Sequence, residues 1–167
     1  MMKIRLLILG CLLSLSANAA GDDPDALVLA ALTIRSGNGA IYRGISTTSY
    51  DIVYSVKDGK VYRGDGRFAS PADALYTIRD GIVYEGNSMY PFGIAYSIRN
   101  GRIYRGDWRY ATLMDILYTV IGGQLYKGDS TFPLDIVYTV KDNRIYEGRG
   151  EFGTMFNALY TIEDGSF

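Results

Sequence analysis

The chain has 167 residues, of which 48% are hydrophobic and 21% are charged, and its formal net charge is −1. This balance is typical of a globular protein and provides no strongly basic surface for nucleic acid. The sequence contains no His, and its one Cys is Cys11, which excludes Ser–His–Asp and Cys–His catalysis, His/Cys zinc sites and disulfides within the chain.

Residues 1–19 have the pattern of a secretory signal peptide. Lys3 and Arg5 precede a short apolar run, and small residues end the segment at Ala19. Cys11 resembles the modified Cys of a bacterial lipoprotein, but the apolar run continues past it to Leu15, so we favour cleavage near Ala19 over a lipid anchor. We therefore expect an exported protein, periplasmic or extracellular.

The remaining sequence predicts one domain. Removing the leader takes away 2 of the 17 basic residues, which leaves 15 basic and 18 acidic residues and a net charge of −3. No later stretch is long and apolar enough for a membrane span. We expect an N-terminal segment at residues 20–28 and a single repeat domain at residues 29–167.

A phrase of about 21 residues repeats along this domain. Its consensus is Tyr-Ser/Thr-Ile/Val-x-Asp-Gly-x-Ile/Val-Tyr-x-Gly, with the two Tyr always eight residues apart. A degenerate copy opens at residues 32–34, and a truncated copy covers residues 160–167. The framework residues are Tyr54, Tyr62, Tyr76, Tyr84, Tyr96, Tyr104, Tyr118, Tyr126, Tyr138, Tyr146, Gly59, Gly64, Gly81, Gly86, Gly101, Gly106, Gly123, Gly128 and Gly148.

Each copy predicts a β-hairpin, because β-branched and aromatic residues flank an Asp-Gly or Asn-Gly pair. The turn type stays open: a two-residue loop places Tyr54 opposite Arg63, and a three-residue loop with a bulge places it opposite Tyr62. Both faces of the first strand are partly apolar. Since a lone hairpin is marginal in water, we expect six or seven hairpins to cover one another.

The linkers between hairpins alternate in length. From the second Tyr of one copy to the first Tyr of the next, the spacing alternates between 12 and 14 residues, which gives a double period of 42 residues. Neighbouring hairpins are therefore expected to occupy two alternating environments.

Three all-β architectures satisfy these constraints. The first is a closed ring of radiating hairpins, the second an open hairpin solenoid like that of choline-binding repeats, and the third a β-trefoil. The phrase at residues 76–86, with the Asp-Ile-Leu-Tyr that ends at Tyr118, resembles the bacterial 5-fold β-flower repeat proteins. The resemblance implies a closed ring and no particular activity, although six or seven copies and alternating linkers depart from it. We rank the ring first.

The two ends of the repeat array are expected to meet. The segment Leu27–Ile34 is apolar and lacks the Tyr, and Asn157–Ile162 is a first strand after which the chain stops. We predict that these two segments come together and close the ring.

The linkers hold the candidate ligand-contacting residues, because the copies differ most there. These residues are Trp108, Tyr90, Tyr110 and Phe132, which offer aromatic faces to a ligand. Trp108 is the one Trp of the chain and stands where equivalent copies have Gly66 and Gly150.

The regular positions have simpler interpretations. We expect the repeated Tyr to pack in the core and between strands. The aspartates that precede the first strands are expected to cap the backbone rather than to bind calcium; they are Asp51, Asp73, Asp115 and Asp135. Arg43, Arg63, Arg105 and Lys127 follow the second Tyr, and this pattern reads as a solvated face or as protection of strand edges.

These patterns favour a non-enzymatic protein without a catalytic site, cofactor or metal. The first hypothesis is a binding module for a glycan, a cell-wall fragment or a protein. The second is a structural or self-assembling extracellular protein, although charges interrupt each strand and Gln/Asn ladders are absent.

Overall fold

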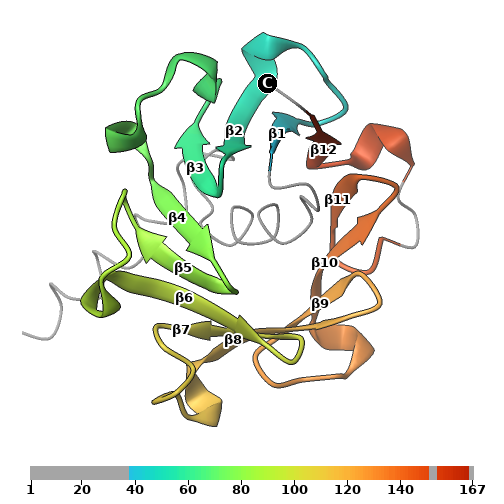
Figure 1. Cartoon of the computed structure of the whole chain (residues 1–167). Helices are drawn as coiled ribbons and strands as arrows, with labels where there is room; N and C mark the ends of the chain where they lie inside the picture. Colours follow the sequence, from blue (N-terminus) through green and yellow to red (C-terminus); the bar gives the residue numbers. More distant parts are fainter. Residues whose placement is uncertain (1–37, 151–153, 166–167) are drawn as a thin grey trace, which may run out of the picture.

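The computed structural model describes residues 38–150 and 154–165, in which all strands belong to one closed antiparallel sheet (Figure 1). Each strand pairs with its neighbours in the chain, and the ring closes where the first described strand meets the last. The strands are β1 (Gly39–Arg43), β2 (Ile52–Lys57), β3 (Lys60–Arg63), β4 (Tyr76–Arg79), β5 (Ile82–Glu85), β6 (Ile94–Arg99), β7 (Arg102–Arg105), β8 (Ile116–Ile121), β9 (Gln124–Lys127), β10 (Ile136–Lys141), β11 (Arg144–Glu147) and β12 (Tyr160–Asp164).

This closed ring confirms the predicted fold and is inconsistent with both alternatives. An open solenoid leaves a free strand edge at each end, whereas β1 and β12 here have two neighbours each. A trefoil divides its strands between a barrel and a cap, whereas the strands here share one sheet.

The ring contains six hairpins, and both ends of the chain build the sixth. β12 pairs with β1 as Tyr160↔Arg43, Thr161↔Tyr42 and Ile162↔Ile41. This is the register that β2 and β3 use within one continuous hairpin, where Tyr54 faces Arg63. The repeat that stops without its second strand is therefore completed by β1.

The predicted closure is correct for the C-terminal segment and wrong about its partner. β12 lies between β11 and β1, so neither of its edges is left for Leu27–Ile34. The segment Leu27–Ile34 itself, the signal peptide and residues 20–28 lie outside the described residues.

The hairpins use the shorter of the two predicted turns. Tyr54 pairs with Arg63 and Lys57 pairs with Lys60, which leaves Asp58 and Gly59 as a two-residue loop. Both loop residues have positive φ, 51° and 71°, as a type I′ turn requires. Such a turn matches the right-handed twist of the two strands, so the Asp-Gly and Asn-Gly pairs fix the hairpin register.

Strand alternation gives the sheet two different faces. One face carries the first Tyr of each repeat and the apolar residues that form the core; Val61, Ile103, Leu125 and Ile145 on this face are at most 1% exposed. The other face carries the Ser or Thr after that Tyr and the second Tyr of the repeat. Since the linkers pack on this second face and run around the outside of the ring, the core face points inward (Figure 1).

The linkers contain short 3-10 helices and lie together at one end of the strands, opposite the hairpin turns. They are η1 (Ser49–Asp51), η2 (Gly66–Phe68), η3 (Pro71–Asp73), η4 (Pro91–Gly93), η5 (Leu113–Asp115), η6 (Pro133–Asp135) and η7 (Met155–Asn157). Hairpins that precede a shorter linker and hairpins that precede a longer linker belong to the same barrel. The 42-residue period therefore distinguishes the linkers and not the hairpins. None of the helices in the described part of the chain is long and apolar enough to cross a membrane.

Candidate functional site

The linker end of the ring is the region in which the repeats differ, and its backbone is held by short polar contacts. The carboxylate of Asp73 accepts hydrogen bonds from the Ser70 N–H and hydroxyl, both at 2.8 Å. Asp115 accepts equivalent bonds from Thr112, at 2.7 and 2.8 Å. These bonds lower the pKa of both carboxyls, and they confirm that these aspartates cap linkers.

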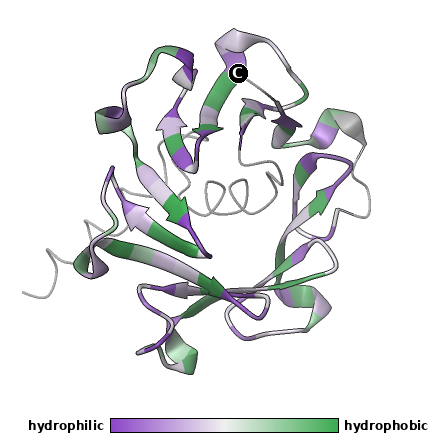
Figure 2. Cartoon of the chain, in the orientation of Figure 1, coloured by the Kyte–Doolittle hydropathy of each residue, from purple (hydrophilic) through white to green (hydrophobic). Residues whose placement is uncertain are grey.

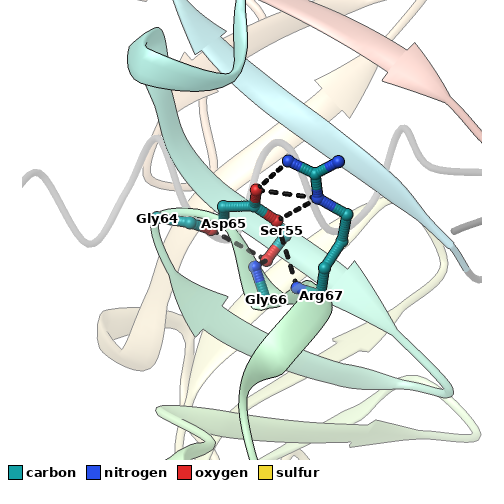
Figure 3. Close-up of polar contacts among 5 residues, drawn as sticks. All are labelled: Ser55, Gly64, Asp65, Gly66 and Arg67. Carbon is teal, nitrogen blue, oxygen red and sulfur yellow. Dashed lines mark hydrogen bonds and ion pairs between the residues drawn. The ribbon is translucent and has the colours of Figure 1, made fainter.

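A buried hydroxyl in each hairpin holds the start of the following linker. In the β2–β3 hairpin, the Ser55 hydroxyl donates to the Gly64 carbonyl at 2.8 Å and accepts the Gly66 N–H at 2.7 Å (Figure 3). Beside this contact, the Arg67 guanidinium donates to both Asp65 oxygens and lowers the pKa of that carboxyl. The linker between β3 and β4 is thus pinned against the outer face of the ring.

Replacing Ser55 with Ala is expected to destabilise the fold by about 2–3 kcal/mol, because the buried Gly66 N–H and the half-buried Gly64 carbonyl lose their partner. Ser55 is 0% exposed and Gly66 is also buried, so water cannot replace the hydroxyl without rearrangement. Chemical denaturation measures the change in the free energy of unfolding.

Thr119→Val is the matched control for this prediction. The Thr119 hydroxyl donates to the Gly128 carbonyl at 2.8 Å, and Val keeps the shape of the side chain while removing that one bond. We expect a loss of about 1 kcal/mol for Thr119→Val. Equal losses for the two variants would contradict the double role of Ser55.

Large apolar side chains stand exposed on the linkers. The residue two positions before the first strand residue is almost fully exposed in several repeats: Tyr50 is 97%, Phe92 103%, Met114 96% and Leu134 91% exposed. Figure 2 shows hydrophobic colour on several of the 3-10 helices around the ring. Repetition of one exposed apolar position around a ring indicates a contact surface rather than scattered exposure.

The structure places the four predicted contact residues on linkers, in two different settings. Tyr90, Tyr110 and Phe132 are 75%, 84% and 72% exposed. Trp108 is half-buried, and the guanidinium carbon of Arg99 lies 3.6 Å from the centroid of its ring. Its backbone N–H donates to the Ser97 hydroxyl at 2.8 Å, so Trp108 covers its own hairpin and offers less surface to a ligand than the other three.

The first Tyr of each repeat lies on the inner face, close to the Tyr of the next hairpin. The ring centroids of Tyr76 and Tyr96 are 6.3 Å apart and their planes are tilted by 53°. Burial raises the pKa of the Tyr76 hydroxyl, and the negative charge of Glu85 raises it further. The predicted packing role of these Tyr is consistent with this geometry.

A pocket of about 400 Å³ opens between the β6–β7 and β8–β9 hairpins. Tyr96, Tyr118, Arg105 and Lys127 line it, together with residues 116–117 and Gly128. Each Tyr faces one of the cations across its own hairpin, in the pairs Tyr96↔Arg105 and Tyr118↔Lys127. Pairing between β7 and β8 ends at Tyr104↔Ile116, so Arg105 lies past the last pair, where the two hairpins separate.

The charged part of this pocket is not apparent from the sequence. Arg105 and Lys127 were expected on a solvated face or at protected strand edges, because strand alternation does not show which face turns inward. The signal that finds them is the hairpin register: a two-residue turn places each cation on the same face as the core Tyr opposite it. No cluster of three or more metal-ligating side chains occurs in the residues that the structure describes.

Comparison with known proteins gives one match. Residues 30–114 and 70–167 match the model of a family described as 6-fold beta flower protein. The six hairpins of the ring agree with that description, and the five-fold symmetry of the resemblance drawn from sequence does not apply. No curated protein and no solved structure matches the sequence significantly.

Proposed function

The chain belongs to the 6-fold beta flower family, and from its ring and linkers we propose that it is an exported, non-enzymatic binding module for a cell-surface glycan. The observation that carries this proposal is the set of exposed aromatic side chains on the linkers. They are Tyr50, Phe68, Tyr90, Phe92, Tyr110, Phe132 and Phe156, each at least 72% exposed.

Exposed aromatic rings suit a carbohydrate ligand for a physical reason. A rigid ring offers a flat apolar face at low entropic cost, and the axial C–H groups of a pyranose pack against such a face. The closed sheet supports this role, because a scaffold without free edges in its described part can hold the linkers at fixed spacings. The leader predicted from residues 1–19 would deliver the module to the cell surface.

The test is co-sedimentation of the purified protein with insoluble bacterial cell-wall polysaccharide. A triple variant replaces Tyr90, Tyr110 and Phe132 with Ser, and we expect its binding to fall at least about tenfold, because each aromatic contact contributes about 0.5–1.5 kcal/mol. Undiminished binding by the triple variant would overturn the proposal.

Two controls sharpen this test. Ile121→Ser changes an apolar side chain that is 47% exposed at the hairpin-turn end of β8, away from the linkers, and should leave binding unchanged. Protease treatment of the cell-wall material should also leave binding unchanged. A loss after protease would show that the partner is a protein and would reject the glycan.

The alternative of a self-assembling protein receives less support. Fibre growth by strand addition needs an unpaired edge, and every strand in residues 38–150 and 154–165 has two neighbours. Light scattering across a range of concentrations tests this alternative directly, since a constant monomer mass contradicts assembly.

A further inference from the structure

We propose that the pocket between the β6–β7 and β8–β9 hairpins binds the carboxylate-bearing sugar unit of an acidic glycan. The inference rests on the proposed function and adds a location and a ligand class to it. Two positively charged residues, two Tyr and two apolar residues line one hollow. Its volume of about 400 Å³ lies within the usual range for small-molecule sites.

The charges around the inner mouth of the ring explain why this position differs from its equivalents. The residue after the second Tyr is, in ring order, Arg43, Arg63, Glu85, Arg105, Lys127 and Glu147. We call the boundary between two neighbouring hairpins a seam. At four of the six seams, the two residues at this position therefore have opposite charges. The β7–β8 seam combines Arg105 with Lys127, and the seam formed by β1 and β2 combines Arg43 with Arg63.

Two neighbouring cations repel each other unless an anion lies between them. Neither Arg105 nor Lys127 forms an ion pair with another residue in the described part of the chain. Asp115 is an acidic group whose pKa responds to Arg105, but its carboxylate is already bound by Thr112 within the linker. Glu85 and Glu147 flank the two cations in the ring order, and neither forms an ion pair with them in the described residues, so an anion bound in the pocket would be attracted by both cations.

The walls of the pocket favour a ring-shaped acid over a bare anion. Tyr96 and Tyr118 stand on neighbouring hairpins, and Ile116 and Leu117 add apolar surface between the strands. A small inorganic anion would contact the cations and leave this apolar surface exposed. A uronic acid has a carboxylate for the cations and a pyranose ring for the aromatic walls.

Titration calorimetry with small probes tests the chemistry of the site. We expect D-glucuronate to bind the full-length protein at least about tenfold more tightly than glucose, which lacks the charge, and than acetate or inorganic phosphate, which lack the ring. Equal affinity for phosphate and glucuronate would reduce the pocket to a charge-only site and would overturn the sugar assignment. No binding of glucuronate would overturn the proposal entirely.

A charge-neutralising variant tests the location. Arg105→Gln combined with Lys127→Gln removes both positive charges and keeps long polar side chains, so the ring should still fold. We expect glucuronate binding to fall at least about tenfold in this variant, with little change in the melting temperature. Unchanged glucuronate affinity in a folded variant would reject the site.

The matched control makes the same change in net charge on the outer face, at Arg79→Gln and Lys141→Gln, two exposed positions near hairpin turns. This control should bind glucuronate like the parent protein, and an equal loss would attribute the effect to overall charge and reject the pocket. Failure of the proposed glycan-binding function can also be distinguished from failure of the proposed pocket. Loss of wall binding in the Ser triple variant with intact glucuronate binding supports both, whereas glucuronate binding without any wall binding rejects the proposed function alone.

Discussion

Removal of residues 158–167 is expected to abolish the folded monomeric ring. This truncation deletes β12, which carries Tyr160 and Ile162, 7% and 3% exposed, and it uncovers the facing core residue Ile41. Loss of one buried Ile side chain alone costs about 2–5 kcal/mol, and the whole stability of a domain is about 5–15 kcal/mol. The deletion also removes two strand ladders and leaves β1 and β11 as free edges.

Circular dichroism during heating and light scattering measure this outcome. We expect the truncated chain to show no cooperative melting transition and to aggregate. A chain that lacks only residues 166–167 keeps β12 complete and should melt like the parent protein. Addition of a peptide covering residues 154–165 should restore a cooperative transition to the truncated chain, since that peptide supplies the missing strand.

A double variant tests whether another segment of the truncated chain can take the place of β12. Leu32-Thr33-Ile34 repeats the Thr-Ile pair of β12, and in the truncated chain this segment is the natural substitute for the missing strand. Combining the truncation with Ile34→Pro prevents this, because Pro lacks the N–H that a strand ladder needs. A folded monomer from the double variant would contradict the closure that the structure shows.

Gly123→Ala is expected to cost about 3 kcal/mol of folding stability. Gly123 has φ +79°, and a Cβ at this position would lie 2.7 Å from the Val140 carbonyl oxygen of the next hairpin. The left-handed conformation alone costs a non-Gly residue about 1–2 kcal/mol. The approach to a backbone atom adds to this cost, because the N–H of Val140 donates to the Gly123 carbonyl at 2.7 Å and this bond holds the two segments together.

The neighbouring Gly122 provides the matched control in the same turn. Its φ is +57°, and a Cβ there meets no atom within 4 Å. We expect Gly122→Ala to cost about 1 kcal/mol, and Gly122→Asp to be neutral, because other repeats have Asp at this position with φ 51°. Equal losses for Gly122→Ala and Gly123→Ala, measured by denaturant unfolding, would show that the close approach to Val140 has no energetic effect.

Asn143 shows how far the turn tolerates a side chain. It occupies the position of Gly123 in the β10–β11 hairpin with φ +58°, and its carbonyl accepts the Ile162 N–H at 2.8 Å. Its smaller φ and the tolerance of Asn for left-handed backbone allow the same contact without Gly. The contact between each turn and the next hairpin is therefore the conserved geometry within this ring, and Gly is the usual way to reach it.

Local sequence was sufficient for the hairpins because their signals are short-range. Two Tyr eight residues apart around an Asp-Gly pair predict two strands and a tight turn without any distant contact, although the choice between a two-residue and a three-residue turn stayed open. The aspartate caps of the linkers are equally local, since Asp73 and its partner Ser70 are three residues apart. The need for the hairpins to cover one another left a ring, a solenoid and a trefoil open, and the ring was ranked first after the resemblance to the β-flower repeat proteins.

The candidate site was less accessible to sequence reasoning. Tyr90, Tyr110 and Phe132 are exposed on the linkers, and their contact with a ligand stays a prediction. The half-buried position of Trp108 under Arg99 depends on a cation–π contact that spacing does not reveal. The cationic pocket depends on two hairpins separating at one seam, which is a property of the closed sheet.

The sequence by itself determined the all-β hairpin repeat, its double period, the composition that excludes His and Cys chemistry, and the aromatic character of the linkers. The tertiary structure alone decided that β1 completes the repeat begun by β12, that six hairpins close the ring, and that Arg105 and Lys127 meet at one seam. The physical reason is the sequence separation of the contacts. A turn and a strand pattern depend on neighbouring residues. Closure of the ring and the pocket depend on pairing between distant segments, and the free energy of that pairing is gained only when the whole ring is formed.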